Sequence, residues 1–148
     1  MIANYWPYLL AVGVGAALTV QVGMNATVAR ALGSPLWAAV VNFLVGLVVL
    51  VAVAAAAAPR PGPGAVAGVP PWAWFGGVLG ALFVAASTVL GPRIGALALV
   101  AFVLAGQLVT ALLVDQFGVL GFPRAEVTPV RLLGAALLVV GALLVLRR

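Results

Sequence analysis

The sequence contains no cysteine, no histidine and no lysine, and its only acidic residues are Asp115 and Glu126. The first two absences exclude disulfides, thiolate chemistry and imidazole metal sites. Two carboxylates are too few to build a metal cage within one chain. Without histidine and with so few carboxylates, the chain also has no pair of side chains for general acid–base catalysis. We therefore expect no enzyme activity, no metal and no cofactor.

Charged residues of either sign are scarce throughout the chain. They make up 6% of the sequence, against about 25% in soluble domains, whereas 66% of the residues are apolar. Too little polar surface exists to cover a water-facing globule, so lipid must be the solvent. The net charge of +5 is carried by arginines that are scattered between apolar runs. This is the pattern of helix-end anchors, and it does not indicate a nucleic-acid partner.

Five apolar stretches reach the length of about 20 residues that a spanning helix needs. Ser34-Pro35 and Thr128-Pro129 are typical helix starts, because a hydroxyl caps free amides and proline needs no donor there. The prolines from Pro59 to Pro71 predict an extended linker, and Gly91-Pro92-Arg93 predicts a break. The predicted helices are about 5–31, 34–58, 71–90, 94–114 and 129–146.

These stretches predict an all-α integral membrane protein, with one five-helix domain over residues 1–148. The N-terminal stretch lacks a basic segment and a cleavage site, so we expect it to be retained. The composition, with arginine as the only basic residue and with much alanine, glycine and valine, favours a GC-rich prokaryotic source and a multi-pass protein of the inner membrane.

The arginines give almost no orientation signal. With five spans, Arg60, Arg124 and Arg131 fall on one side, and Arg30, Arg93 and the C-terminal pair Arg147-Arg148 fall on the other. Orientation normally follows the arginine and lysine excess on the cytoplasmic side. Two interpretations remain open: a single orientation set by the C-terminal pair, or dual topology. Dual topology predicts an antiparallel homodimer that is an inverted repeat of ten helices.

Polar side chains within the apolar stretches are the candidates for a substrate pathway. Gln21 and Asn25 lie four residues apart and share one face of the first helix. Asn42, Gln107 and Thr110 lie within the second and fourth helices. Carboxamides both donate and accept hydrogen bonds, which suits a neutral polar or zwitterionic solute. The same groups could instead hold helices together by hydrogen bonds worth roughly 0.6–2 kcal/mol.

Two further residues have competing interpretations. Asp115, at the end of the fourth helix, could be a proton-linked coupling group, or an interfacial residue paired with Arg124 or with an arginine of a partner. Trp74 could face a substrate, or could belong to the aromatic belt of the membrane interface. Gly76, Gly77 and Gly80 favour close helix packing and could let the third helix bend.

Several motifs together resemble the YdcZ-like family of the drug/metabolite transporter superfamily. They are Gln21-x-Gly23-x-Asn25, Asn42-Phe43-x-x-Gly46, Gly76-Gly77-x-x-Gly80-Ala81, Gly106-Gln107 and Asp115-x-Phe117-Gly118-x-x-Gly121. The resemblance covers nearly the whole chain. It implies a five-helix half of a ten-helix exporter, in a family whose members work as antiparallel homodimers, as pairs with an oppositely oriented paralogue, or as fused chains. The more distant small multidrug resistance proteins use a glutamate in helix 1, and no acid is present here.

We therefore expect a secondary transporter that exports a small polar or amphipathic metabolite or drug. Alternating access would take place around a cavity at a dimer interface. Two alternatives remain: a channel-like pore, and a structural or accessory membrane subunit in which the polar groups only join helices. The expected partners are the lipid bilayer, a second copy or a paralogue, and a small-molecule substrate.

Overall fold

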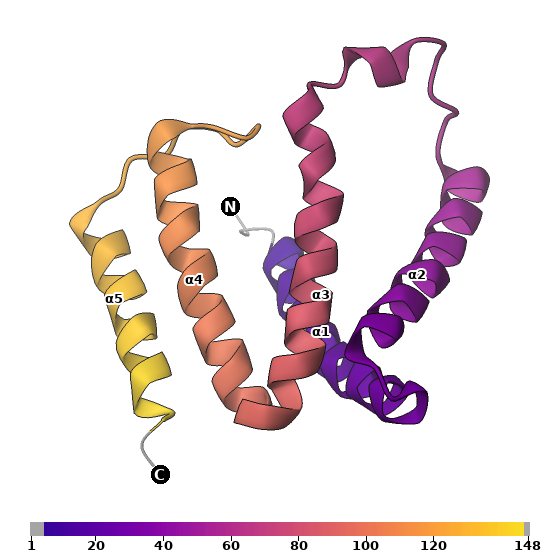
Figure 1. The fold of residues 1–148 in the computed structure, drawn as a ribbon. Helices are drawn as coiled ribbons and strands as arrows, with labels where there is room; N and C mark the ends of the chain where they lie inside the picture. Colours follow the sequence, from indigo (N-terminus) through magenta and orange to yellow (C-terminus); the bar gives the residue numbers. More distant parts are fainter. Residues whose placement is uncertain (1–4, 147–148) are drawn as a thin grey trace. The chain divides into compact units, whose positions relative to one another are not determined.

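The computed structural model describes residues 5–146, and these are helical without any strand (Figure 1). The all-α prediction is therefore confirmed for this part of the chain. The helices are α1 (Trp6–Leu32), α2 (Pro35–Ala57), α3 (Phe75–Ile94), α4 (Ala96–Phe117) and α5 (Pro129–Leu144), with the short 3₁₀ helices η1 (Ala65–Gly68) and η2 (Pro71–Trp74). They form two compact units, Met1–Arg93 and Ile94–Arg148. Arg147 and Arg148, which entered the orientation argument, lie outside the described residues.

In the first unit, a tight turn joins α1 to α2. Gly33 adopts a left-handed conformation with φ of 66°, and its amide donates to the carbonyl of Ala29 at the end of α1. The Ser34 hydroxyl accepts a hydrogen bond from the Trp37 amide at 3.3 Å, and Pro35 is the first residue of α2. Glycine is favoured at such a C-cap because it lacks a Cβ. Serine followed by proline is favoured at the start of the next helix, because the hydroxyl accepts from a free amide and proline has no amide to satisfy. The predicted start of this helix is confirmed.

The linker between α2 and α3 forms an arch in Figure 1. It contains η1 and η2, and α3 begins at Phe75 rather than at the predicted Pro71. The paired Pro70 and Pro71 explain the difference, because a proline at the start of a turn supplies no amide and favours a short 3₁₀ segment before the regular helix. Trp72 and Trp74 therefore lie in η2, outside α3.

The predicted break at Gly91-Pro92-Arg93 is wrong. Helix α3 continues through Pro92 to Ile94, and the chain leaves the helical conformation at Gly95. Pro92 lies in the last turn, where it removes one donor of the hydrogen-bond ladder and only two further helical residues follow it. Gly95 has φ of 86° and ψ of 154°, a conformation that is essentially restricted to glycine. The residue type that ends the helix is therefore glycine rather than proline.

The second unit is the antiparallel pair α4 and α5, joined by the loop of residues 118–128. Thr128 caps α5 by accepting from the Arg131 amide at 3.3 Å, and Pro129 follows it, which confirms the predicted start. Helix α5 has 16 residues and is therefore about 24 Å long. This is shorter than the hydrocarbon core of about 30 Å.

Four helices are long and apolar enough to cross a membrane, namely α1, α2, α4 and the segment Pro71–Ile94 that includes η2 and α3. In each of them, only 11% of the spanning window is buried within the chain. Large side chains such as Leu9, Val48 and Leu79 are therefore exposed along the described helices. Such surfaces are stable only against lipid or another protein.

Candidate functional site

A hydrogen bond between two carboxamides links the spanning helices of the first unit. Gln21 on α1 donates from Nε2 to Oδ1 of Asn42 on α2 at 3.1 Å, and the pair is partly buried. Replacing either residue by an apolar one would leave the carboxamide of the other without a hydrogen-bond partner in an apolar environment. The structure thus brings together two of the residues that the sequence singled out.

Asn25 lies one helical turn beyond Gln21 on α1, and it is 7% exposed. Within residues 5–146, no hydrogen bond joins its carboxamide to another side chain, and its polar atoms are not fully enclosed. A carboxamide that is buried yet still reachable can offer both a donor and an acceptor to an incoming group. Of the predicted pathway residues, Asn25 best meets the requirement for solute contact.

The other pathway candidates lie outside the group formed by Gln21, Asn25 and Asn42. Gln107 lies on α4 in the second unit and is exposed. Thr110, also on α4, donates its hydroxyl to the carbonyl of Gly106 at 2.9 Å, so its donor is already used within its own helix. Trp74 lies in η2 with 57% of its surface exposed. This exposure fits the interfacial aromatic belt as well as it fits a substrate contact.

The three glycines of α3 lie in open surroundings within the chain. A Cβ added to Gly76 or Gly77 would meet nothing within 4 Å, and one added to Gly80 would meet only the Phe43 ring at 3.8 Å. No close backbone approach to these glycines therefore exists among the described residues. The surfaces at Gly76 and Gly77 are therefore left open within the first unit, where a small residue would allow a helix to approach closely.

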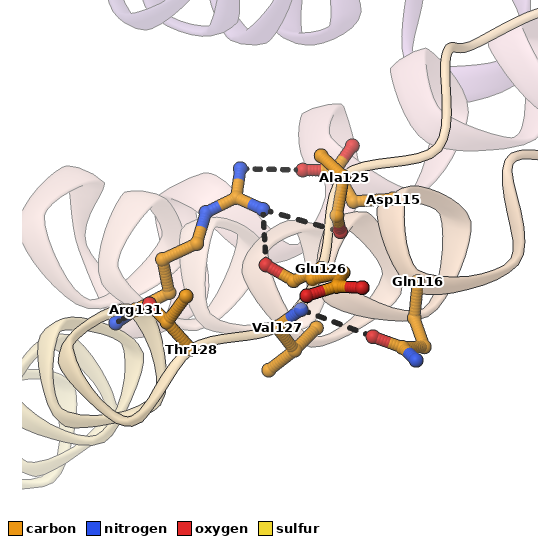
Figure 2. Close-up of polar contacts among 7 residues, drawn as sticks. All are labelled: Asp115, Gln116, Ala125, Glu126, Val127, Thr128 and Arg131. Carbon is orange, nitrogen blue, oxygen red and sulfur yellow. Dashed lines mark hydrogen bonds and ion pairs between the residues drawn. The ribbon is translucent and has the colours of Figure 1, made fainter.

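Asp115, at the end of α4, is paired with an arginine of α5 (Figure 2). Nη2 of Arg131 lies 2.7 Å from Oδ2 of Asp115. Nη1 of the same guanidinium donates to the carbonyls of Ala125 and Glu126, at 3.4 and 3.3 Å. The predicted interfacial pairing of Asp115 is therefore present, but its partner is Arg131 and not Arg124.

Neighbouring contacts complete this polar cluster of the 118–128 loop. The Ala125 amide donates to the backbone carbonyl of Asp115 at 2.8 Å. The Gln116 side chain accepts from the Val127 amide at 3.0 Å (Figure 2). These bonds hold the returning loop against the end of α4, so that the first turn of α5 begins beside it.

In the sequence, Arg131 contributed only to the orientation charge, and its contact with Asp115 was not predicted. The sequence did contain a sign of such a contact. Arg131 lies in the first turn of α5, two residues after Pro129. A cation in the first turn of a helix faces the positive end of the helix dipole and is unfavourable there unless other groups compensate. An arginine at that position therefore indicates a nearby carboxylate or free carbonyls.

Gln21, Asn25 and Asn42 are thus neutral hydrogen-bonding groups within long apolar helices. Comparison with known proteins identifies the family of the chain. A family described as "Putative inner membrane exporter, YdcZ" matches residues 6–144. The chain belongs to this family. The resemblance drawn from the sequence motifs is thus confirmed.

A curated member of the YdcZ family, "Inner membrane protein YdcZ" of Escherichia coli (strain K12), is 37% identical to this chain over 143 residues. The match covers 95% of this chain and 93% of the relative. No solved structure matches the chain. The predicted location in the inner membrane is confirmed, and the family is one of membrane exporters rather than of enzymes.

Proposed function

We propose that the chain is half of a secondary transporter that exports a small neutral polar or zwitterionic solute. The observation that carries the proposal is the arrangement on α1 and α2. Gln21 is paired with Asn42 at 3.1 Å, while Asn25, one turn along, is buried without a partner among the described residues. In this arrangement, the pair fixes the two helices and Asn25 contacts the solute.

The absence of acids from the first unit limits the coupling chemistry. Residues 1–93 include no aspartate or glutamate, so no carboxylate of this segment can exchange a proton for a cation. Asp115, the remaining coupling candidate, is bound to Arg131, and this pairing favours a role in holding the loop. Asn25, beside the Gln21–Asn42 pair, would accordingly recognise the solute as a neutral group.

A second copy of the chain, inserted in the opposite orientation, would complete the transport pathway. In each spanning window only 11% of the residues are buried, which leaves apolar surface for lipid or a second copy. With five spans, the arginines would divide three against four between the two membrane sides, and so small a bias favours insertion in both directions. The resulting assembly would have ten spanning helices, with the shorter α5 accommodated by local thinning of the bilayer.

Solute binding and transport are tested on the full chain reconstituted in liposomes. Neutral and zwitterionic metabolites are first screened for thermal stabilisation of the protein, and the hits are then measured by counterflow. Asn25→Leu is expected to weaken transport of a hit at least about tenfold, because the lost carboxamide leaves a polar group of the solute unpaired. Thr19→Val is the matched control, since the Thr19 hydroxyl donates to Gly15 within the same helix. If no solute in a broad screen binds or moves, the proposal fails.

A structural subunit is the second candidate, because the Gln21–Asn42 hydrogen bond alone would serve it. In that case, Asn25→Leu would change stability without changing any binding. A channel would instead give stepwise currents and no saturation with solute concentration. Counterflow and single-channel recording on the same preparation separate these three functions.

A further inference from the structure

A cavity of about 360 Å³ opens in the first unit, where α1 ends and α2 begins, beside the last turns of α3. Arg30 lines it from the last turn of α1 and Arg93 from the last turn of α3. Within residues 5–146, the backbones of α1 and α3 make no close contact, so the hollow separates the two helices. Its volume falls in the range of about 300–1,000 Å³ that is usual for ligand pockets.

The charges of this cavity are not balanced by its own part of the chain. Residues 1–93 carry Arg30, Arg60 and Arg93 and no acid. Among the described residues, the acid–base pair is that of Asp115 with Arg131, in the other unit. Both arginines are exposed at this pocket, and no acid of residues 1–93 competes for them, so they are available to an anion from outside this segment.

The walls of the cavity can hold an oxyanion. The Arg30 guanidinium is oriented by one hydrogen bond, from Nη2 to the Thr27 hydroxyl at 3.0 Å, so one of its five donors is used there. Thr88, only 2% exposed, lies in the wall and donates its hydroxyl to Val84. Arginine forks match the geometry of phosphate oxygens, and two of them can hold one phosphate group.

The position of the cavity favours a lipid headgroup, rather than a soluble phosphate, as the ligand. Both arginines lie in the last turn of a membrane-spanning helix, at the level where lipid headgroups are found. Basic pockets between spanning helices at this level take the headgroups of anionic lipids. We propose that the cavity between Arg30 and Arg93 binds the phosphate of an anionic phospholipid. This site is separate from the Gln21, Asn25 and Asn42 group, and it does not depend on transport.

Lipid binding is measured on the purified full chain in neutral detergent by native mass spectrometry. The probes are phosphatidylglycerol and phosphatidylcholine with the same acyl chains. We expect a preference for phosphatidylglycerol that falls about thirtyfold in the double variant Arg30→Gln with Arg93→Gln. Arg93→Gln alone should lower it about fivefold, and this variant leaves the bond from Arg30 to Thr27 in place.

Arg60→Gln is the control, because it removes the same charge from the same unit, in the linker that follows α2. An equal loss of preference in this variant would overturn the proposal, since the attraction would then come from net charge alone. An unchanged preference in Arg93→Gln would overturn it as well.

In a competition experiment, inorganic phosphate or glycerol phosphate is added in large excess to the lipid-bound protein. Retention of phosphatidylglycerol supports the lipid assignment. Displacement of the lipid, with the same thermal stabilisation of the protein, would assign the cavity to a soluble anion and overturn the assignment to lipid.

Discussion

Arg131 of α5 places its Nη2 atom 2.7 Å from Oδ2 of Asp115 and joins the first turn of that helix to the end of α4 (Figure 2). The guanidinium also contacts two loop carbonyls, and it lies at the positive end of the helix dipole. The carboxylate and the carbonyls together offset this unfavourable position. The ion pair therefore holds the loop of residues 118–128 against the ends of the two helices.

Removal of this ion pair should lower stability only modestly. The side chains of Arg131 and Asp115 are 42% and 27% exposed, and exposed pairs contribute about 0.2–1 kcal/mol. In a double-mutant cycle with Arg131→Gln and Asp115→Asn, we expect a coupling energy in that range. Unfolding of the purified protein in detergent at low and high salt measures it, and salt should reduce it. Arg124→Gln is the control, and an equal effect of this variant would contradict the assigned pairing.

Separation of the Gln21–Asn42 pair should have a larger structural effect than loss of an exposed carboxamide. A coupling energy of about 0.6–1.7 kcal/mol is expected between Gln21→Leu and Asn42→Leu, the range measured for such bonds in a membrane protein. Reversible unfolding in mixed detergent micelles gives the four free energies. Gln107→Leu removes an exposed carboxamide of α4 and should leave the free energy of unfolding nearly unchanged. A coupling energy near zero would show that the pair does not hold α1 to α2.

Alanine at Gly118 should destabilise the protein more than alanine at Gly121. Both glycines have positive φ, 60° and 85°, which costs a side chain about 1 kcal/mol. At Gly118 the new Cβ would also lie 2.9 Å from the Cβ of Arg124 and 3.1 Å from its backbone, whereas at Gly121 it would meet nothing within 4 Å. We expect Gly118→Ala to cost about 1–3 kcal/mol more than Gly121→Ala, from thermal unfolding of both variants. Equal losses would mean that the loop relaxes away from the contact.

Orientation in the membrane can be read from introduced cysteines, because the natural sequence has none. Gly62→Cys places a thiol in the linker that follows α2, and Leu32→Cys places one at the end of α1, next to the turn that precedes α2. If the chain inserts in both directions, an impermeant maleimide added to intact cells should label about half of the copies of each variant. Complete labelling of one variant and none of the other would exclude the antiparallel homodimer. An oppositely oriented paralogue would then be the remaining partner.

Composition by itself determined that this protein lies in a membrane, because a chain with 6% charged residues cannot cover a water-facing surface. The sequence also determined two helix starts, at Ser34-Pro35 and Thr128-Pro129, since capping depends on neighbouring residues alone. The motifs were sufficient to identify the family.

Contacts between distant residues were decided only by the tertiary structure. Local rules placed a break at Pro92, yet the helix continues to Ile94, since Pro92 affects only the last turn, and Gly95 supplies the conformation that ends it. Nothing local pairs Gln21 with Asn42 or Asp115 with Arg131. Each pair depends on how two helices meet, as does the cavity that brings Arg30 near Arg93.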